Sequence, residues 1–185
     1  MVTIDPTNGK ELEKLYENPD VDVDALAYSK KRKVITFATF TTAKQERKFF
    51  DSEKREDVTK LVEKLPGYEV EVSANDKAED KFIVVASNDR TPGTRNLFDL
   101  KSGNLTKLVE VAPWLKENEL APMKPIEYQS RDGLTIHGYL TLPLGREAKN
   151  LPVVINPHGG PWFRDTWGSI PRCNFWPIAV TPSCR

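Results

Sequence analysis

Two glycines between a histidine and a proline are the residues of this chain best suited to chemistry. They lie in His158-Gly159-Gly160-Pro161, soon after the apolar run Val153-Val154-Ile155. A β-branched run of this kind predicts a buried strand, and glycine lets the backbone at its end turn sharply and present bare N–H groups to a ligand. Amide donors held in this way stabilise the oxyanion that forms when a nucleophile attacks a carbonyl carbon. The turn therefore predicts an oxyanion site.

The nucleophile and the base that such a site needs have no counterpart in the sequence. In α/β-hydrolases this type of loop acts with a serine in a Gly-x-Ser-x-Gly elbow, and none of the eight serines lies between two such glycines. The two histidines, His137 and His158, do not follow such a serine in the order Ser, Asp, His that this fold uses. We therefore expect that no member of a catalytic triad is present and that the chain alone is inactive.

Composition excludes several other functions. The 27 basic and 27 acidic residues cancel, which removes the electrostatic reason to expect nucleic acid or an anionic membrane as partner. No apolar run approaches the roughly 20 residues that span a bilayer. Asp20, Asp22 and Asp24 resemble the start of a calcium loop, but Ala25 and Lys31 stand where glycine and glutamate are needed. We expect no metal and no cofactor.

The N-terminus has neither a basic segment nor an apolar segment of the kind that marks a protein for secretion. The two cysteines, Cys173 and Cys184, lie close together and are not spread through the chain as a disulfide framework would be. Both observations favour a cytoplasmic location.

Residues 1–112 show short alternating strands and a weak repeat. The pairs Ile4-Asp5, Phe50-Asp51 and Phe98-Asp99 recur at intervals of 46 and 48 residues, close to the length of one four-stranded propeller blade. We predict about two blades of a partial β-propeller here. In the middle copy, residues 51–65 place Val58, Leu61, Val62 and Leu65 at helical spacing, which predicts an inserted amphipathic helix whose charged face is solvated surface.

The rest of the chain divides into three predicted parts. Residues 113–124 are punctuated by prolines, as a crossing between domains is. Residues 125–168 begin with a predicted hairpin around the turn of residues 130–133 and read as the start of an α/β-hydrolase domain. Residues 169–185 contain three prolines and no periodicity, so we expect a disordered tail, which a frameshift or a truncated gene copy would explain.

Two sequence blocks resemble the prolyl oligopeptidase family of serine peptidases. They are Arg131-Asp132-Gly133-Leu134-Thr135-Ile136-His137-Gly138-Tyr139-Leu140 and His158-Gly159-Gly160-Pro161-Trp162-Phe163-Arg164-Asp165-Thr166-Trp167-Gly168. The acylaminoacyl-peptidase and dipeptidyl-aminopeptidase branch is the most similar. The resemblance covers residues 1 to about 168 and implies the last two blades of a propeller followed by the first strands of an α/β-hydrolase domain, that is, a fragment of a peptidase that cleaves short peptides.

The resemblance also implies roles for single residues. The N–H of Gly160, with that of Gly159, would point at the substrate carbonyl oxygen, and His158 would line the site. Trp162 and Arg164 are candidate substrate-site residues. Arg164 and Asp165 form either a surface ion pair or a substrate contact, and the sequence favours neither alternative. His137 shares a strand face with polar neighbours and is predicted to be a hydrogen-bonded structural histidine.

A second hypothesis comes from a different class of protein. If the catalytic half has been lost, the chain is a non-catalytic, propeller-derived fragment that binds a protein partner through exposed strand edges. A probe that acylates reactive serines should leave the chain unlabelled under either hypothesis, and labelling would reveal an overlooked nucleophile. The oligomeric state is left open.

Overall fold

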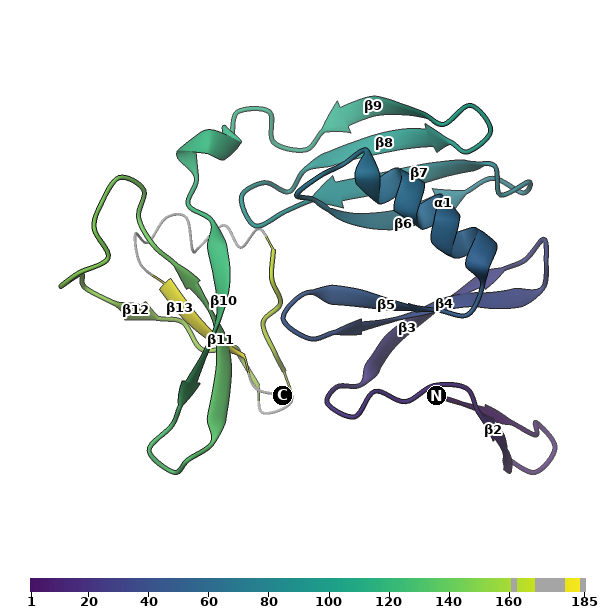
Figure 1. The fold of residues 1–185 in the computed structure, drawn as a ribbon, viewed down its shortest axis with the longest axis horizontal. Coiled ribbons are helices and arrows are strands. Elements are labelled where there is room, and N and C mark those ends of the chain that lie inside the picture. The colour runs from purple at the N-terminus through teal and green to yellow at the C-terminus, as the bar shows by residue number, and fades with distance from the viewer. Residues whose placement is uncertain (161–162, 169–178, 184–185) are drawn as a thin grey trace.

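The computed structural model describes residues 1–160, 163–168 and 179–183, and Figure 1 shows that most of its regular structure is β. The prediction of a mostly β chain is confirmed. The elements, in chain order, are β1 (Val2–Ile4), β2 (Glu11–Lys14), β3 (Val23–Ser29), β4 (Val34–Thr41), β5 (Gln45–Phe49), α1 (Ser52–Glu63), β6 (Glu69–Asn75), β7 (Lys81–Ser87), β8 (Thr94–Asp99), β9 (Asn104–Glu110), the 3-10 helix η1 (Glu117–Glu119), β10 (Met123–Gln129), β11 (Thr135–Thr141), β12 (Val154–Ile155) and β13 (Ala179–Ser183).

Three antiparallel sheets follow one another along the first part of the chain. They are the hairpin β1–β2, the three-stranded sheet β3–β4–β5 and the four-stranded sheet β6–β7–β8–β9, and they lie in this order from purple to teal in Figure 1. The fourth sheet, with order β10–β11–β13–β12, is mixed because β12 runs parallel to β13. The two larger antiparallel sheets lie within residues 1–112, where about two blades are predicted, and β1–β2 is an additional pair of strands before them.

The repeated aspartates have the same structural role in the first and third copies. Asp5 comes directly after β1 and Asp99 is the last residue of β8, and each accepts a backbone N–H from the next turn, at 2.8 and 3.0 Å. Each turn ends on a glycine with almost the same positive φ, 70° at Gly9 and 69° at Gly103. A short carboxylate that satisfies turn amides, followed by a residue that tolerates the left-handed region, closes a hairpin. The predicted repeat is therefore a repeated turn.

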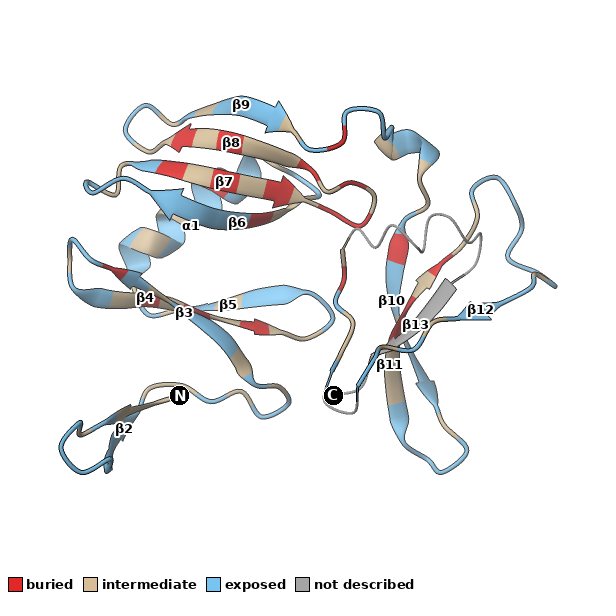
Figure 2. Cartoon of the chain, turned by 180° about the vertical axis from the view of Figure 1, so that it is seen from behind, coloured by how far each residue is buried: buried red, intermediate tan, exposed pale blue. Residues whose placement is uncertain are grey.

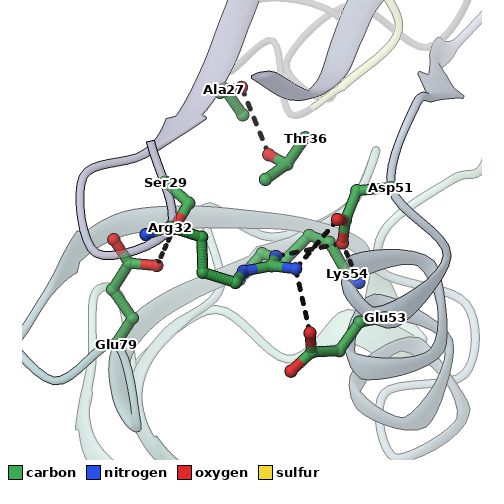
Figure 3. Close-up of polar contacts among 8 residues, drawn as sticks. All are labelled: Ala27, Ser29, Arg32, Thr36, Asp51, Glu53, Lys54 and Glu79. Carbon is green, nitrogen blue, oxygen red and sulfur yellow. Dashed lines mark hydrogen bonds and ion pairs between the residues drawn. The ribbon is translucent and has the colours of Figure 1, made fainter. Parts of the chain in front are cut away.

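In the middle copy, Asp51 begins a helix instead of a hairpin. Its carboxylate accepts the backbone N–H of Lys54 at 2.7 Å and is the N-cap of α1, and the helix itself lies within the predicted residues 51–65. The same carboxylate accepts hydrogen bonds from both terminal nitrogens of Arg32, at 2.8 and 3.0 Å. The carboxylate of Glu53 accepts a further hydrogen bond from one of these nitrogens at 2.9 Å (Figure 3). Arg32 therefore joins the β3–β4 turn to the start of the helix.

The prediction that the charged face of α1 is solvated surface is wrong for one residue, Lys54, which is half-buried, whereas Glu53 is exposed. Glu53 takes part in the ion pair with Arg32, and the ammonium of Lys54 lies 4.2 Å from the ring centre of Phe82 on β7. Burial of Lys54 lowers the pKa of its ammonium. Sequence periodicity shows which face of a helix is polar, but it does not show which other element packs over that face.

The main hydrophobic core lies between α1 and the four-stranded sheet. Its buried members are Leu61 of the helix and Val70, Phe82, Val84 and Phe98 of the strands. Figure 2 shows buried and partly buried positions alternating along β7 and β8. This alternation follows from the period of two in a strand, which turns every second side chain toward the core.

Residues 113–124, the segment predicted to be a crossing, are attached by polar contacts to residues beside the four-stranded sheet. The carboxylate of Glu117, in η1, accepts from Tyr68 at 2.6 Å, from Asn88 at 2.8 Å and from Arg90 at 2.6 Å. Six residues later, the N–H of Met123 donates to the buried carboxylate of Asp89 at 2.6 Å. The β7–β8 loop therefore fixes the position of the start of β10, the first strand of the fourth sheet.

Residues 169–185 are predicted to be a disordered tail, but the part of this tail that the structure describes, residues 179–183, is a strand. Residues 179–183 form β13, which pairs antiparallel with β11 and parallel with β12. Strand pairing satisfies backbone groups whatever the side-chain periodicity, which is why an aperiodic sequence can form this strand. The remaining residues of the tail, 169–178 and 184–185, lie outside the described part of the chain.

Candidate functional site

The strand before the glycine turn is short and exposed. β12 covers only Val154 and Ile155, and the side chains of Val153 and Ile155 keep 59% and 67% of their accessible surface. The prediction of a buried strand over residues 152–156 is therefore wrong in this structure. Among the described strands β12 pairs only with β13, and the described helix α1 contacts β5 and β6. A strand is buried only when other elements cover its faces, and none of the described elements covers β12.

Gly159 and Gly160 form an open turn that begins after the three residues following this strand. Both are exposed, and a Cβ added to either would meet no atom within 4 Å. Gly160 has φ +69°, in the left-handed region that glycine adopts at no steric cost. Among the hydrogen bonds found between described residues, none uses the N–H of Gly159 or Gly160. Glycine is needed at position 160 for its backbone conformation, and its surroundings leave room for a ligand.

His158 and Asp165 lie next to this turn. The Nδ1 atom of His158 is 3.3 Å from the carbonyl oxygen of Gly159, and the His158 side chain is half-buried. Burial raises the pKa of the Asp165 carboxyl, and the charge of His158 acts in the opposite direction. The Oδ2 atom of Asp165 is buried and has no hydrogen-bond partner in the described part of the chain.

Arg164 has a role that neither sequence alternative foresaw. Its two terminal nitrogens donate to the backbone carbonyls of Thr41 and Thr42 at 2.8 and 2.6 Å. Within the described ranges its guanidinium forms no ion pair with Asp165. Trp162, the other candidate substrate-site residue, lies outside the described residues, as does Pro161.

Two further side chains hold the same β4–β5 turn. The phenol of Tyr139, on β11, donates to the carbonyl of Ala43 at 2.8 Å, and the ammonium of Lys44 lies 3.5 Å from the ring centre of Trp167. We call this set of contacts, made by Tyr139, Arg164 and Trp167 to residues 41–44, the turn clamp. Tyr139 and Trp167 are buried together with Met123, and the indole N–H of Trp167 donates to the Met123 carbonyl at 3.0 Å. The sequence carried no local signal for these pairings.

The predicted hairpin before the site is confirmed. β10 and β11 pair antiparallel over their whole lengths, and Gly133 closes the turn between them with φ +84°. His137 lies opposite Glu127 in this pairing, and its Nδ1 atom is 3.0 Å from the Glu127 carboxylate. This contact agrees with the predicted structural role of His137. A cavity of about 200 Å³ lies between this hairpin and the turn clamp.

The described residues contain no group of three or more His, Cys, Asp or Glu side chains that could hold a metal ion. In the same part of the chain, no helix has both the length and the apolar character needed to cross a membrane. The polar groups at the glycine turn are its backbone amides and the imidazole of His158, whose charge acts on the nearby carboxyl of Asp165. Such a set can bind a developing negative charge, but it contains no nucleophile.

Comparison with known proteins gives one match by sequence and several by structure. The chain is 36% identical over 132 residues to dipeptidyl aminopeptidase BIII of Pseudoxanthomonas mexicana, a match that covers 68% of this chain and 19% of that protein. No protein-family model matches.

Three solved structures are similar in fold. Dipeptidyl peptidase 4 of Porphyromonas gingivalis has a TM-score of 0.65 at 13% identity, over 98% of this chain and 27% of that one. Prolyl oligopeptidase B of Galerina marginata bound to a 35mer substrate has a TM-score of 0.63 at 16% identity, and the match covers 100% of this chain and 27% of that one. A structure from a study of two prolyl endopeptidases has a TM-score of 0.64 at 14% identity, and the match covers 98% of this chain and 27% of that one. At these identities the structural matches show a shared fold, and the chain spans about a quarter of the length of each structure.

Proposed function

We propose, from the premise that the chain belongs to the prolyl oligopeptidase family of peptidases, that it supplies the oxyanion loop of a serine peptidase acting on short peptides. Residues 1–112 would be propeller blades, residues 113–124 the crossing, and residues 125–168 the first part of an α/β-hydrolase domain. The observation that carries the proposal is the open turn at Gly159 and Gly160, exposed and free of steric contacts, at the end of a strand.

In the proposed reaction, an activated serine hydroxyl attacks the scissile carbonyl carbon, and the carbonyl oxygen becomes negatively charged. The N–H groups of Gly160 and Gly159 donate hydrogen bonds to this oxygen. Such donors act best when they lie about 2.7–3.1 Å from the position of the oxyanion and need no reorganisation during the reaction. His158, whose Nδ1 atom is 3.3 Å from the carbonyl oxygen of Gly159, would border the same space.

The chain supplies the donors but not the serine. None of its serines lies in a Gly-x-Ser-x-Gly elbow, and neither histidine follows such a serine. Loss of the nucleophile and its base removes the covalent route, while the oxyanion donors by themselves form no acyl-enzyme. We infer that hydrolysis requires residues beyond these 185 and that this chain alone is inactive.

The first test treats the purified chain with a fluorophosphonate probe and with a chromogenic dipeptidyl substrate. We expect neither covalent labelling nor turnover. Labelling of any serine would show a nucleophile that the sequence pattern misses, and would contradict the inferred inactivity.

The second test asks whether this glycine turn supports catalysis. The aligned region of dipeptidyl aminopeptidase BIII is replaced by the matching residues of this chain. Gly160→Pro, which lacks the N–H donor and also cannot adopt the φ of +69°, is compared with Gly160→Ala, which keeps the donor. Loss of one oxyanion donor should lower kcat about 10²–10³-fold with little change in KM. Since a Cβ at position 160 meets no atom within 4 Å, alanine adds mainly backbone strain.

Equal kcat values for the proline and alanine variants of an active chimera would refute the oxyanion role of Gly160. In that case the second hypothesis, a non-catalytic fragment that binds a protein partner, would become the better account of this chain.

A further inference from the structure

The guanidinium of Arg164 binds two consecutive carbonyls of a turn that lies more than 120 residues earlier in the chain. Its Nη1 atom is 2.8 Å from the oxygen of Thr41 and its Nη2 atom 2.6 Å from that of Thr42. Two parallel N–H donors fix both the position and the orientation of the guanidinium plane. The β4–β5 turn is itself closed by a backbone hydrogen bond from Thr42 to Lys44 at 3.1 Å, so Arg164 is attached to an ordered element.

The other members of the turn clamp hold the chain on either side of this contact. Tyr139 binds the next carbonyl of the turn, at Ala43, and Trp167 lies against the ammonium of Lys44. Trp167 is also fixed from the other side, because its indole N–H donates to Met123 within a buried cluster. The chain from Arg164 to Trp167 is therefore held at both of its ends.

Arg164 lies four residues after Gly160, so the two Cα atoms can be at most about 14 Å apart along the chain. Between described residues, no hydrogen bond uses the N–H of either glycine of the turn. A Cβ at Gly159 or Gly160 would meet no atom within 4 Å, and glycine has more backbone freedom than any other residue. Preorganised donors must be held to about 0.5 Å, and a short segment anchored at one end has far fewer accessible conformations than a free one.

From this arrangement we propose that Arg164 is a positioning residue. By binding the carbonyls of Thr41 and Thr42 it fixes the end of the glycine turn against the β4–β5 turn of the three-stranded sheet, and so holds the N–H of Gly160 in one direction. The functional meaning of this inference rests on the proposed oxyanion role. Arg164 itself need not contact substrate.

The test uses the full chain labelled with ¹⁵N-glycine and measures backbone order parameters by NMR relaxation. Gly138 on β11 and Gly93 before β8 report on the sheets, and Gly160 reports on the turn. Arg164→Met keeps most of the aliphatic stem but removes all donors, and Arg164→Lys keeps a single donor group. Arg131→Met is the matched control, because Arg131 is exposed in the β10–β11 turn.

We expect an order parameter for Gly160 near 0.85 in the wild-type chain, below about 0.6 in Arg164→Met, and between these values in Arg164→Lys. Gly138 and Gly93 should keep their values, and Arg131→Met should change none of them. If Arg164→Met lowers the order parameters of all three glycines, the protein has unfolded. In that case the order parameters of the Arg164→Lys variant test the proposal. A selective loss of order at Gly160 in that variant supports the proposal, and unchanged order overturns it.

An order parameter of Gly160 that stays high in Arg164→Met, or that is already low in the wild-type chain, also overturns the proposal. This readout involves no catalysis. The positioning role of Arg164 can therefore be confirmed even if the comparison of Gly160→Pro with Gly160→Ala refutes the oxyanion role of Gly160. Failure of the positioning role and failure of the oxyanion role are thus distinguishable.

Discussion

The phenol of Tyr68 donates a 2.6 Å hydrogen bond to the carboxylate of Glu117, a residue of the crossing segment. This bond is the main reason why the pKa of Glu117 is lowered, and it raises the pKa of Tyr68 to about 12. Asn88 and Arg90 donate to the same carboxylate, so one side chain accepts from three donors, one just before β6 and two in the β7–β8 loop. The crossing is thus fixed by an ionised group, which makes its attachment dependent on pH.

The first prediction concerns acid. Because the folded-state pKa of Glu117 lies below its ordinary value of 4.5, its stabilising contribution is present above that value and is lost as the pH falls through the folded pKa. Glu117→Gln should lower the free energy of unfolding by about 1–2 kcal/mol near neutral pH, with the difference from wild type shrinking in acid. Urea unfolding followed by tryptophan fluorescence over a pH series measures this.

Glu119→Gln is the matched control, since Glu119 lies in the same 3-10 helix and forms only an exposed ion pair with Lys116. We expect little change in that variant. A destabilisation by Glu117→Gln that stays constant from neutral to acid pH would show that the carboxylate charge is not responsible.

The second prediction concerns Gly93, between β7 and β8. Its φ is +80°, and a Cβ at this position would lie 1.7 Å from the carbonyl oxygen of Ala86. That oxygen belongs to the backbone of β7 and cannot move without disturbing the sheet. Gly93→Ala should therefore destabilise the fold by roughly 3 kcal/mol or more, as seen in the urea midpoint.

Gly103→Ala separates the clash from the backbone strain. Gly103 has φ +69°, and a Cβ there would meet no atom within 4 Å, so its replacement should cost only about 1 kcal/mol. Similar losses in the two alanine variants would contradict the close approach of Gly93 to β7.

The third prediction separates two roles of Asp51. Its carboxylate caps α1 through the N–H of Lys54 and pairs with Arg32. Asp51→Asn keeps a side-chain oxygen for the cap but removes the charge, and should cost about 0.5–1 kcal/mol. Asp51→Ala removes both and should cost about 2 kcal/mol. Helix content by circular dichroism, together with urea unfolding, distinguishes them.

Glu53→Gln removes the exposed partner of Arg32 and leaves the cap in place, so we expect a change of less than about 0.5 kcal/mol. If Asp51→Asn is as damaging as Asp51→Ala, the ion pair with Arg32, and not the cap, is the dominant contribution.

Local sequence determined a large part of this fold. The repeat of Asp5, Asp51 and Asp99 predicted equivalent strand ends, and the structure has two matching turns and one helix cap at these positions. The β10–β11 hairpin and the structural pairing of His137 were also predicted. Each of these features depends on contacts within a turn, a helix or a pair of adjacent strands, for which neighbouring residues carry the information.

Packing between distant elements decided the rest. The apolar residues of β12 predicted burial, but burial depends on which other elements cover a strand, and its own residues do not specify them. The alternatives for Arg164 were an ion pair with Asp165 or a contact with substrate, whereas its partners are two backbone carbonyls, 123 and 122 residues away. A carbonyl accepts a hydrogen bond whatever side chain its residue carries, so no sequence pattern marks Thr41 and Thr42 as partners. The sequence by itself therefore determined the glycine turn and the strands around it, and only the tertiary structure decided what holds that turn in place.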